Sequence, residues 1–329
     1  MRPGAAAGAA SVRVRAPARL HLGIFPLPGG GFGGLGVALR RPVAEVVARP
    51  ARDLTASGPQ AERALGAARA VAERCAPGAG AALAVVRDIP SHVGLGSGTQ
   101  IDLAAAVAVA RLWGVGAGPR ELAPLVGRAQ RTRVGTETFA GGGLVLYRAG
   151  AEPPAVRLDV PARWRFVVAI PGGASGFAGP DEARAFADLP PMERADVEAI
   201  TAAIDRLLLP SLRAGDVAGV GAALEVIQAR VGDYFAPVQG GRYRHPLGER
   251  LARAMRAAGA WAAGQSSWGP ALFGLAESPG AARRIAAAAR RVLEAWPQGG
   301  WAFVTAVSPG GAAVVVERWP QATDVVYSR

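Results

Sequence analysis

Residues 89–100 read Ile89-Pro90-Ser91-His92-Val93-Gly94-Leu95-Gly96-Ser97-Gly98-Thr99-Gln100. The preceding residues 82–87 have a β-rich pattern, and residues 100–113 place apolar side chains at helical spacing. Glycines allow positive φ angles and close approach to a ligand, and the first free N–H groups of a helix point toward whatever lies above them. The segment therefore predicts a strand-to-helix turn that binds phosphate, the alternative being a structural turn without a ligand.

Length and composition predict a globular protein of two packed domains. The chain has 329 residues, of which 50% are hydrophobic and 19% charged. The apolar stretch 103–110 falls short of the roughly 20 residues that cross a bilayer, so we expect no membrane partner. Residues 1–10 lack the apolar run of a signal peptide, and the single cysteine, Cys75, cannot form an intramolecular disulfide. We expect a cytoplasmic protein.

The charge of the chain favours an anionic partner. The formal net charge is +12, and all 37 basic residues are arginine because the sequence contains no lysine. A coding bias toward GC-rich codons explains arginine in place of lysine, but it does not explain the excess of base over acid. A phosphorylated metabolite and a nucleic acid both fit. Aromatic residues make up only 6% of the chain and the arginines are scattered, so we expect no nucleic-acid partner.

The order of the expected elements indicates an α+β fold. Breakers concentrate in residues 150–161, which predicts two domains, 1–155 and 156–329. Strands are expected at 11–15, 43–48, 82–87, 144–147, 165–170, 302–307 and 312–317. Helices are expected at 62–75, 100–113, 192–209, 216–231, 247–258 and 281–296.

Three ordered motifs resemble those of the GHMP kinases. The central one is the loop at 89–100; residues 16–23 (A-P-A-R-L-H-L-G) resemble the N-terminal substrate motif, and residues 264–274 the C-terminal glycine-rich loop. The resemblance implies a GHMP-kinase fold, with an N-terminal domain like ribosomal protein S5 domain 2 and a ferredoxin-like C-terminal domain. Each motif alone is weak, but together they span about 250 residues.

The details are closer to a group of synthases than to kinases. The strings Q-S-S-W-G-P (265–270), Q-G-G-R-Y-R (239–244) and F-A-G-G-G (139–143) are similar to those of β-ribofuranosylaminobenzene 5′-phosphate synthases. That resemblance implies that C1 of phosphoribosyl pyrophosphate (PRPP) is joined to a ring carbon of an aromatic or heteroaromatic carboxylate, with loss of pyrophosphate and CO₂. We expect these two small molecules as substrates, and a homodimer.

The resemblance and the demands of this reaction suggest roles for particular residues. Two anionic groups on PRPP need arginine and backbone donors. Residues assigned to substrate binding are Arg19, Gly94, Leu95, Gly96, Ser97, Gly98, Thr99, Arg131, Arg133, Gly135, Thr136, Arg242, Arg244, Gln265, Ser266, Ser267 and Trp268. Ser97 and Asp102 are the expected ligands of a Mg²⁺ cofactor, and Glu137, His21 and Asp102 the expected catalytic residues.

Several alternatives stay open. Asp102 equally fits a first-turn carboxylate that complements the helix dipole, and His21 a hydrogen-bonded scaffold residue. Glu137 lies where kinases carry their catalytic acid, which keeps ATP-dependent phosphorylation of a small alcohol as a second function. Arg133 adds a charge that suits a dianionic acceptor, so a pyrazole dicarboxylate, as in C-nucleoside antibiotic synthesis, is favoured over 4-aminobenzoate, as in methanopterin-type cofactor synthesis.

Overall fold

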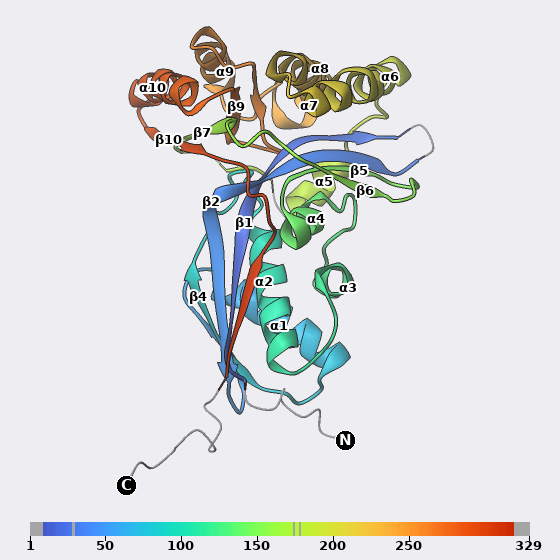
Figure 1. Ribbon diagram of the computed structural model, residues 1–329, viewed down its shortest axis with the longest axis vertical. Helices are drawn as coiled ribbons and strands as arrows, with labels where there is room; N and C mark the ends of the chain where they lie inside the picture. The colour runs from blue at the N-terminus through green and yellow to red at the C-terminus, as the bar shows by residue number, and fades with distance from the viewer. Residues whose placement is uncertain (1–8, 28–29, 174, 178, 319–329) are drawn as a thin grey trace.

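Two β-sheets organise the protein (Figure 1), for which a computed structural model describes residues 9–27, 30–173, 175–177 and 179–318. The larger sheet has the strand order β11-β1-β2-β4-β3, with β5 and β6 added along β2. Its strands are β1 (Ala9–Pro26), β2 (Phe32–Pro50), β3 (Leu54–Ser57), β4 (Ala81–Arg87), β5 (Leu144–Arg148), β6 (Ala155–Leu158) and β11 (Ala313–Arg318). The smaller, antiparallel sheet has the order β10-β7-β9-β8, formed by β7 (Arg165–Pro171), β8 (Ala262–Gln265), β9 (Leu272–Ala276) and β10 (Gly300–Thr305).

The even-numbered side chains of the long strand β1 share one face of the sheet. Its even-numbered residues from Val12 to Leu22 are fully buried in the main core. Successive side chains of a strand point to opposite faces, so Arg13, Arg15, Arg19 and His21 lie on the other side. This alternation is what places Arg19 and His21 together, two residues apart.

Helices α1 (Ala61–Cys75) and α2 (Ser97–Leu112) pack together and lie in the lower body of Figure 1. Helix α2 is apolar around nearly its whole circumference, which is typical of a buried helix. Two short helices follow it, α3 (Pro119–Leu125) and α4 (Val134–Gly141). Helix α2 runs along β1 and β2, and its N-terminus is the phosphate-loop end predicted from the sequence.

The second sheet separates two apolar cores. On β7, Phe166, Val168 and Ile170 join the main core, whereas Val167 and Ala169 face a second core. Helices α9 (Gly248–Ala257) and α10 (Pro279–Glu294) cover that second core at the top of Figure 1. The remaining helical segments are α5 (Pro180–Ala187), α6 (Arg194–Ala202), the π-helical η1 (Ala203–Leu208), α7 (Leu209–Ala214) and α8 (Val217–Gln239).

The division between the sheets differs from the predicted domains at two places. Strand β6, which begins at the predicted boundary, pairs with β5 in the first sheet, and the chain reaches the second sheet only at Arg165. Strand β11, expected in the second domain, pairs antiparallel with β1. The first sheet therefore contains segments from both ends of the described chain, which breaker residues alone could not reveal.

Candidate active site

The phosphate loop has the predicted conformation. Gly94 has φ +90° and Gly96 has φ +77°, and α2 begins at Ser97, three residues earlier than expected. A Cβ placed on Gly96 would lie 2.9 Å from Cγ of Arg19, so the loop leaves room for that arginine because it carries no side chain there. Helix α2 thus begins beneath an arginine side chain.

The three sequence motifs meet at Ser266. Its hydroxyl donates to the carbonyl of Gly94 at 2.7 Å and accepts from the amide of His21 at 2.9 Å. Backbone bonds strengthen the junction, because Arg19 N–H donates to the Leu95 carbonyl (3.1 Å) and Ser267 N–H to the His21 carbonyl (3.1 Å). Segments about 250 residues apart are therefore fixed around one point.

Two adjoining cavities of about 220 and 310 Å³ lie at this junction and share Arg19, Thr99, Arg128, Gly179, Glu182 and Ser267. We call the smaller one the phosphate cavity; its lining includes Gln60, Arg63, His92, Gly94, Gly96, Ser97, Gly98 and Phe177. We call the larger one the ring cavity; its lining includes His21, Ile24, Arg131, Thr132, Gly135 and Phe186.

The side chain of Arg19 lines both cavities, and two of its guanidinium nitrogens lack hydrogen bonds to the described residues. Its Nε and Nη1 are sealed from solvent and have no hydrogen-bond partner among the described residues. Burial lowers the pKa of Arg19 to about 10, with Glu182 raising it and Arg128 lowering it. The group therefore remains charged at neutral pH. A buried cation without a partner is costly, so this position favours an anionic ligand.

Asp102 lies beneath the phosphate loop and is bonded to two arginines. Its Oδ2 accepts from Arg128 Nε at 2.6 Å and from Arg63 Nη1 at 3.2 Å. Burial raises the pKa of Asp102, and Arg128 and Arg63 oppose that shift. A Cβ on Gly98 would lie 3.1 Å from Arg63 Nη1 and 3.3 Å from Arg128 Nη2, so both guanidinium groups stand over the loop.

These contacts do not fit the expected Mg²⁺ site at Ser97 and Asp102, nor a catalytic role for the Asp102 carboxylate. Both arginines are bonded to Oδ2, and two adjacent cations disfavour a metal ion at the same carboxylate. Within the described parts of the chain, no group of three His, Cys, Asp or Glu side chains is placed to hold a metal. Asp102 instead positions Arg63 and Arg128.

His21 faces the ring cavity as a neutral imidazole. Burial, with Arg19 nearby, lowers the pKa of His21 to about 3. Its Nδ1 is buried without a partner among the described residues, and its Nε2 lies 3.5 Å from Thr132 Oγ1. A neutral imidazole offers one donor and one acceptor, which suits hydrogen bonding to a substrate group better than storing a proton.

Glu137 is not placed in either cavity. It lies in α4, 8% exposed, and all of its recorded side-chain bonds go to Arg120, including Nε–Oε1 at 2.8 Å and Nη2–Oε2 at 2.6 Å. Arg120 is largely exposed, and this ion pair raises its pKa. The expected catalytic carboxylate is thus paired toward the surface.

The other expected arginines separate into two groups. Arg131 lies 4.2 Å from the ring centre of Phe186, and Arg244 lies 4.3 Å from that of Phe177, so both flank the cavities by stacking on aromatic rings that line them. Arg133 is exposed at the start of α4 and lines neither cavity. Arg242 forms an ion pair with Asp233 beside a small cavity of about 20 Å³ that shares His21, Ile24 and Ser267 with the ring cavity.

The remaining expected residues form the frame of the site. Gln265 connects two of the synthase-like strings, because its side chain donates to Gln239 at 3.1 Å and accepts from the Arg244 amide at 2.7 Å. Trp268 is buried and stacks on Phe235 at 4.3 Å, so it packs behind the ring cavity without lining it. Thr136 is buried in α4, next to Gly135, which approaches Thr99.

Sequence reasoning missed several lining residues. Arg63 and Arg128 are the most important, and Gln60, Phe177, Glu182 and Phe186 were not expected either. Arg63 belongs to α1 and Arg128 to the loop after α3, so their convergence on Asp102 is a tertiary contact. No local pattern marks it, although arginines near a phosphate loop were the right type to search for.

Comparison with known proteins identifies the family. The model of the GHMP kinases N terminal domain matches residues 62–143, and that of the GHMP kinases C terminal domain matches residues 208–295. The chain belongs to the GHMP kinase superfamily. Within it, the β-ribofuranosylphenol 5′-phosphate synthase of Archaeoglobus fulgidus is 35% identical over 66% of this chain and 75% of its own length. The enzyme of the same name from Methanothermobacter thermautotrophicus is 31% identical over 81% of this chain and 89% of its own length.

These relatives confirm membership of the synthase-like branch, and solved structures confirm the GHMP fold. Homoserine kinase from Cytophaga hutchinsonii aligns with a TM-score of 0.67 at 20% identity, covering 93% of this chain and 98% of the kinase. Mevalonate pyrophosphate decarboxylase from Streptococcus pyogenes aligns at 0.68 with 13% identity, covering 96% and 100%. At these identities the structures establish the fold alone. No helix within the described ranges is long and apolar enough to cross a membrane.

Proposed function

We propose that this chain is a PRPP-dependent C-riboside synthase that acts on an aromatic or heteroaromatic carboxylate. The C1–O bond to pyrophosphate breaks and a C1–C bond forms to the ring carbon that carries the carboxylate. The C–COO⁻ bond then releases CO₂, and its electron pair restores the aromatic ring. The named activity of the two curated relatives, β-ribofuranosylphenol 5′-phosphate synthase, supports this reaction class.

One observation carries the proposal: the buried, unpartnered guanidinium edge of Arg19 between the two cavities. PRPP is anionic at both ends, and its departing pyrophosphate gains charge as the C1–O bond breaks. Fixed cations placed where charge develops stabilise such a transition state. Arg19, Arg63 and Arg128 line the phosphate cavity together with the N-terminus of α2, so cation and helix dipole act on the same space.

The ring cavity suits the acceptor. Phe186 and Ile24 provide apolar surface for a planar ring, and Arg131 is held over Phe186 where it can pair with a carboxylate. His21 and Thr132 supply neutral hydrogen-bonding groups. The chain's own residues therefore bind and orient the two substrates and neutralise their negative charge. In this proposal Mg²⁺ enters with PRPP as part of the substrate, because substrate phosphates commonly bind Mg²⁺ and Asp102 is held by two arginines.

The choice of acceptor now depends on Arg131 and not on Arg133. The exposed Arg133 gives no support for a second carboxylate in the ring cavity. A pyrazole dicarboxylate stays the proposed acceptor because Arg131 lines the ring cavity and Arg128, which is paired with Asp102, borders the same space. A hydroxybenzoate is the competing acceptor, favoured by the phenol product in the relatives' names.

Release of pyrophosphate and CO₂ tests the proposal. PRPP and Mg²⁺ are supplied with 4-aminobenzoate, 4-hydroxybenzoate or an aminopyrazole dicarboxylate, and ATP with small alcohols serves as the kinase control. We expect release only when PRPP and one acceptor are both present. Arg19→Met should reduce kcat/KM by roughly 100-fold or more, whereas Arg49→Met, an exposed arginine elsewhere on β2, should leave it unchanged. ATP consumption without pyrophosphate release would overturn the proposal.

A further inference from the structure

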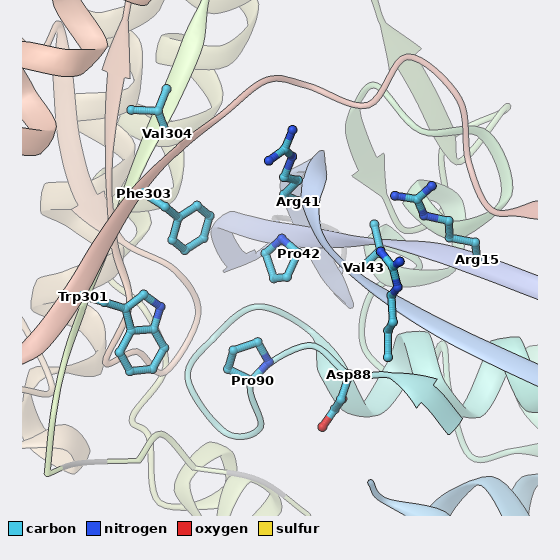
Figure 2. Close-up of a pocket in the computed structure, with 10 residues that line it drawn as sticks. Arg15, Arg41, Pro42, Val43, Asp88, Pro90, Trp301, Phe303 and Val304 are labelled. Atoms are coloured by element: carbon cyan, nitrogen blue, oxygen red, sulfur yellow. The ribbon is translucent and has the colours of Figure 1, made fainter. Parts of the chain in front are cut away.

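A third cavity, of about 810 Å³, lies between the two sheets and is larger than those of the active site. One wall comes from β1, β2 and the end of β4, and the other from β10 (Figure 2). We call it the intersheet cleft. It shares no lining residue with the phosphate cavity, yet both border the segment 87–94. Its volume is within the usual range of small-molecule sites.

The intersheet cleft is basic. Arg15, Arg41 and Arg87 line it, with Asp88 as the acidic residue of the lining. Among the described residues Arg15 and Arg41 have no carboxylate partner, while Arg87 shares Glu45 with Arg13. Asp88 accepts a hydrogen bond from Gln60 at 2.6 Å. Two guanidinium groups are therefore available to an anion, and arginine binds phosphate oxygens in a bidentate manner.

The opposite wall is aromatic. Trp301 and Phe303 lie two residues apart on β10, so they share one face of that strand. Trp301 is 45% exposed, which makes it one of the two most exposed tryptophans among the described residues. Figure 2 shows both rings on the side of the cleft toward Pro42 and Pro90, with the guanidinium groups of Arg41 and Arg15 beyond them. An exposed indole opposite arginines is typical of sites that stack a flat ring and hold its charged substituent.

We propose that the intersheet cleft binds a nucleoside 5′-phosphate, or a C-nucleoside phosphate of the same build. The base stacks on Trp301, and the phosphate pairs with Arg15 and Arg41. A free sugar phosphate would leave the indole uncovered, and an uncharged aromatic ring would leave the arginines unpaired. Because the walls belong to different sheets, such a ligand would bridge them.

The position of the cleft makes the bound nucleotide an effector of the active site. Asp88 in the cleft is bonded to Gln60, and Gln60 lines the phosphate cavity. Pro90 in the cleft lies two residues before His92, which also lines the phosphate cavity and has a strained φ of +57°. A ligand that shifts residues 87–92 would therefore move Gln60 and His92 in the lining of the phosphate cavity. We therefore expect occupancy of the cleft to change the KM for PRPP.

Calorimetry on the full chain tests binding, with AMP, GMP, CMP and UMP as probes and adenosine and ribose 5-phosphate as half-probes. We expect at least one nucleotide to bind at least tenfold more tightly than either half-probe. Trp301→Ala and Arg41→Gln should each weaken it roughly tenfold or more. The matched controls are Trp261→Ala, at a tryptophan that is 42% exposed, and Arg40→Gln, at an arginine that borders a different cavity. Both variants should bind nucleotide as the parent does.

A second comparison separates the cleft from the active site. Arg19→Met removes one arginine of the phosphate cavity, so it should reduce kcat/KM of the synthase reaction roughly 100-fold or more and leave nucleotide binding intact. Loss of nucleotide binding in Arg19→Met, with retention in Trp301→Ala, would place the nucleotide in the active site and overturn the proposal. Absence of binding for all four nucleotides at millimolar concentration would overturn it as well. An unchanged KM for PRPP at saturating nucleotide would exclude the effector role.

Discussion

Helices α2 and α4 each bury one carboxylate against arginine, and they use it in opposite ways. Asp102 in α2 is 5% exposed and Glu137 in α4 is 8% exposed. The partners of Asp102, Arg63 and Arg128, line the phosphate cavity, whereas the partner of Glu137, Arg120, is largely exposed. Asp102 holds two arginines in place at the phosphate cavity, whereas Glu137 holds a single arginine at the surface. Arginines therefore line the phosphate cavity, and no residue of α4 is among its lining residues.

The largest effect should come from the loop at the start of α2. Gly96→Val should eliminate detectable PRPP binding, because a side chain at φ +77° is strained and its Cβ would displace Arg19. Titration calorimetry measures this directly. Gly150→Val is the matched control: Gly150 has the same φ of +77°, but a Cβ there meets nothing within 4 Å. Equal binding by both variants would show that the loop does not hold PRPP.

Asp102→Asn tests whether the carboxylate of α2 acts through its arginines. The neutral amide no longer forms ion pairs with Arg63 and Arg128, so these arginines are held less firmly. The KM for PRPP should therefore rise roughly tenfold, with a smaller change in kcat. The free energy of unfolding should fall by about 1–3 kcal/mol, since both arginines are about a third exposed. A large fall in kcat at unchanged KM would instead indicate a catalytic carboxylate.

His21, in β1 beside the ring cavity, should make stability depend on pH. Its folded-state pKa of about 3 lies below the ordinary 6.5, so between these values the unfolded chain binds a proton that the folded chain excludes. The contribution of neutral His21 to the free energy of unfolding is complete above about pH 6.5 and is lost as the pH falls toward 3. In denaturant titrations, the free energy of unfolding of His21→Gln should fall less steeply with decreasing pH than that of the parent, by up to about 1.4 kcal/mol per pH unit. Identical slopes would mean that His21 titrates normally in the folded chain.

Glu137→Gln should have the smallest effect. Its partner Arg120 is 63% exposed, so loss of the ion pair should cost about 1 kcal/mol or less, and kcat should stay within about twofold. Arg120→Gln should give the same small change, measured by thermal unfolding and by pyrophosphate release. A catalytic acid would lose roughly 100-fold or more on removal of its carboxylate. Such a loss in Glu137→Gln alone would restore the kinase-like role.

The phosphate loop and the fold could be predicted because their determinants are local in sequence. Positive-φ glycines, a preceding strand and a following helix identify residues 89–100, and the three motifs identify the GHMP fold. The roles of the charged residues could not be read in this way. Whether Asp102 meets a metal or two arginines depends on α1 and on the loop at residue 128. Arg131 and Arg133 look equivalent in sequence, yet only Arg131 borders the site.

The pairing of β11 with β1 has a consequence for biosynthesis. Residues 313–318 are translated after the whole second sheet, so β1 has its neighbour β2 early but receives β11 only after the second sheet has been synthesised. Until then the edge of β1 is open and able to pair with other chains. Released chains that end before residue 313 should therefore be more sensitive to aggregation and more dependent on chaperones than released chains that include residues 313–318.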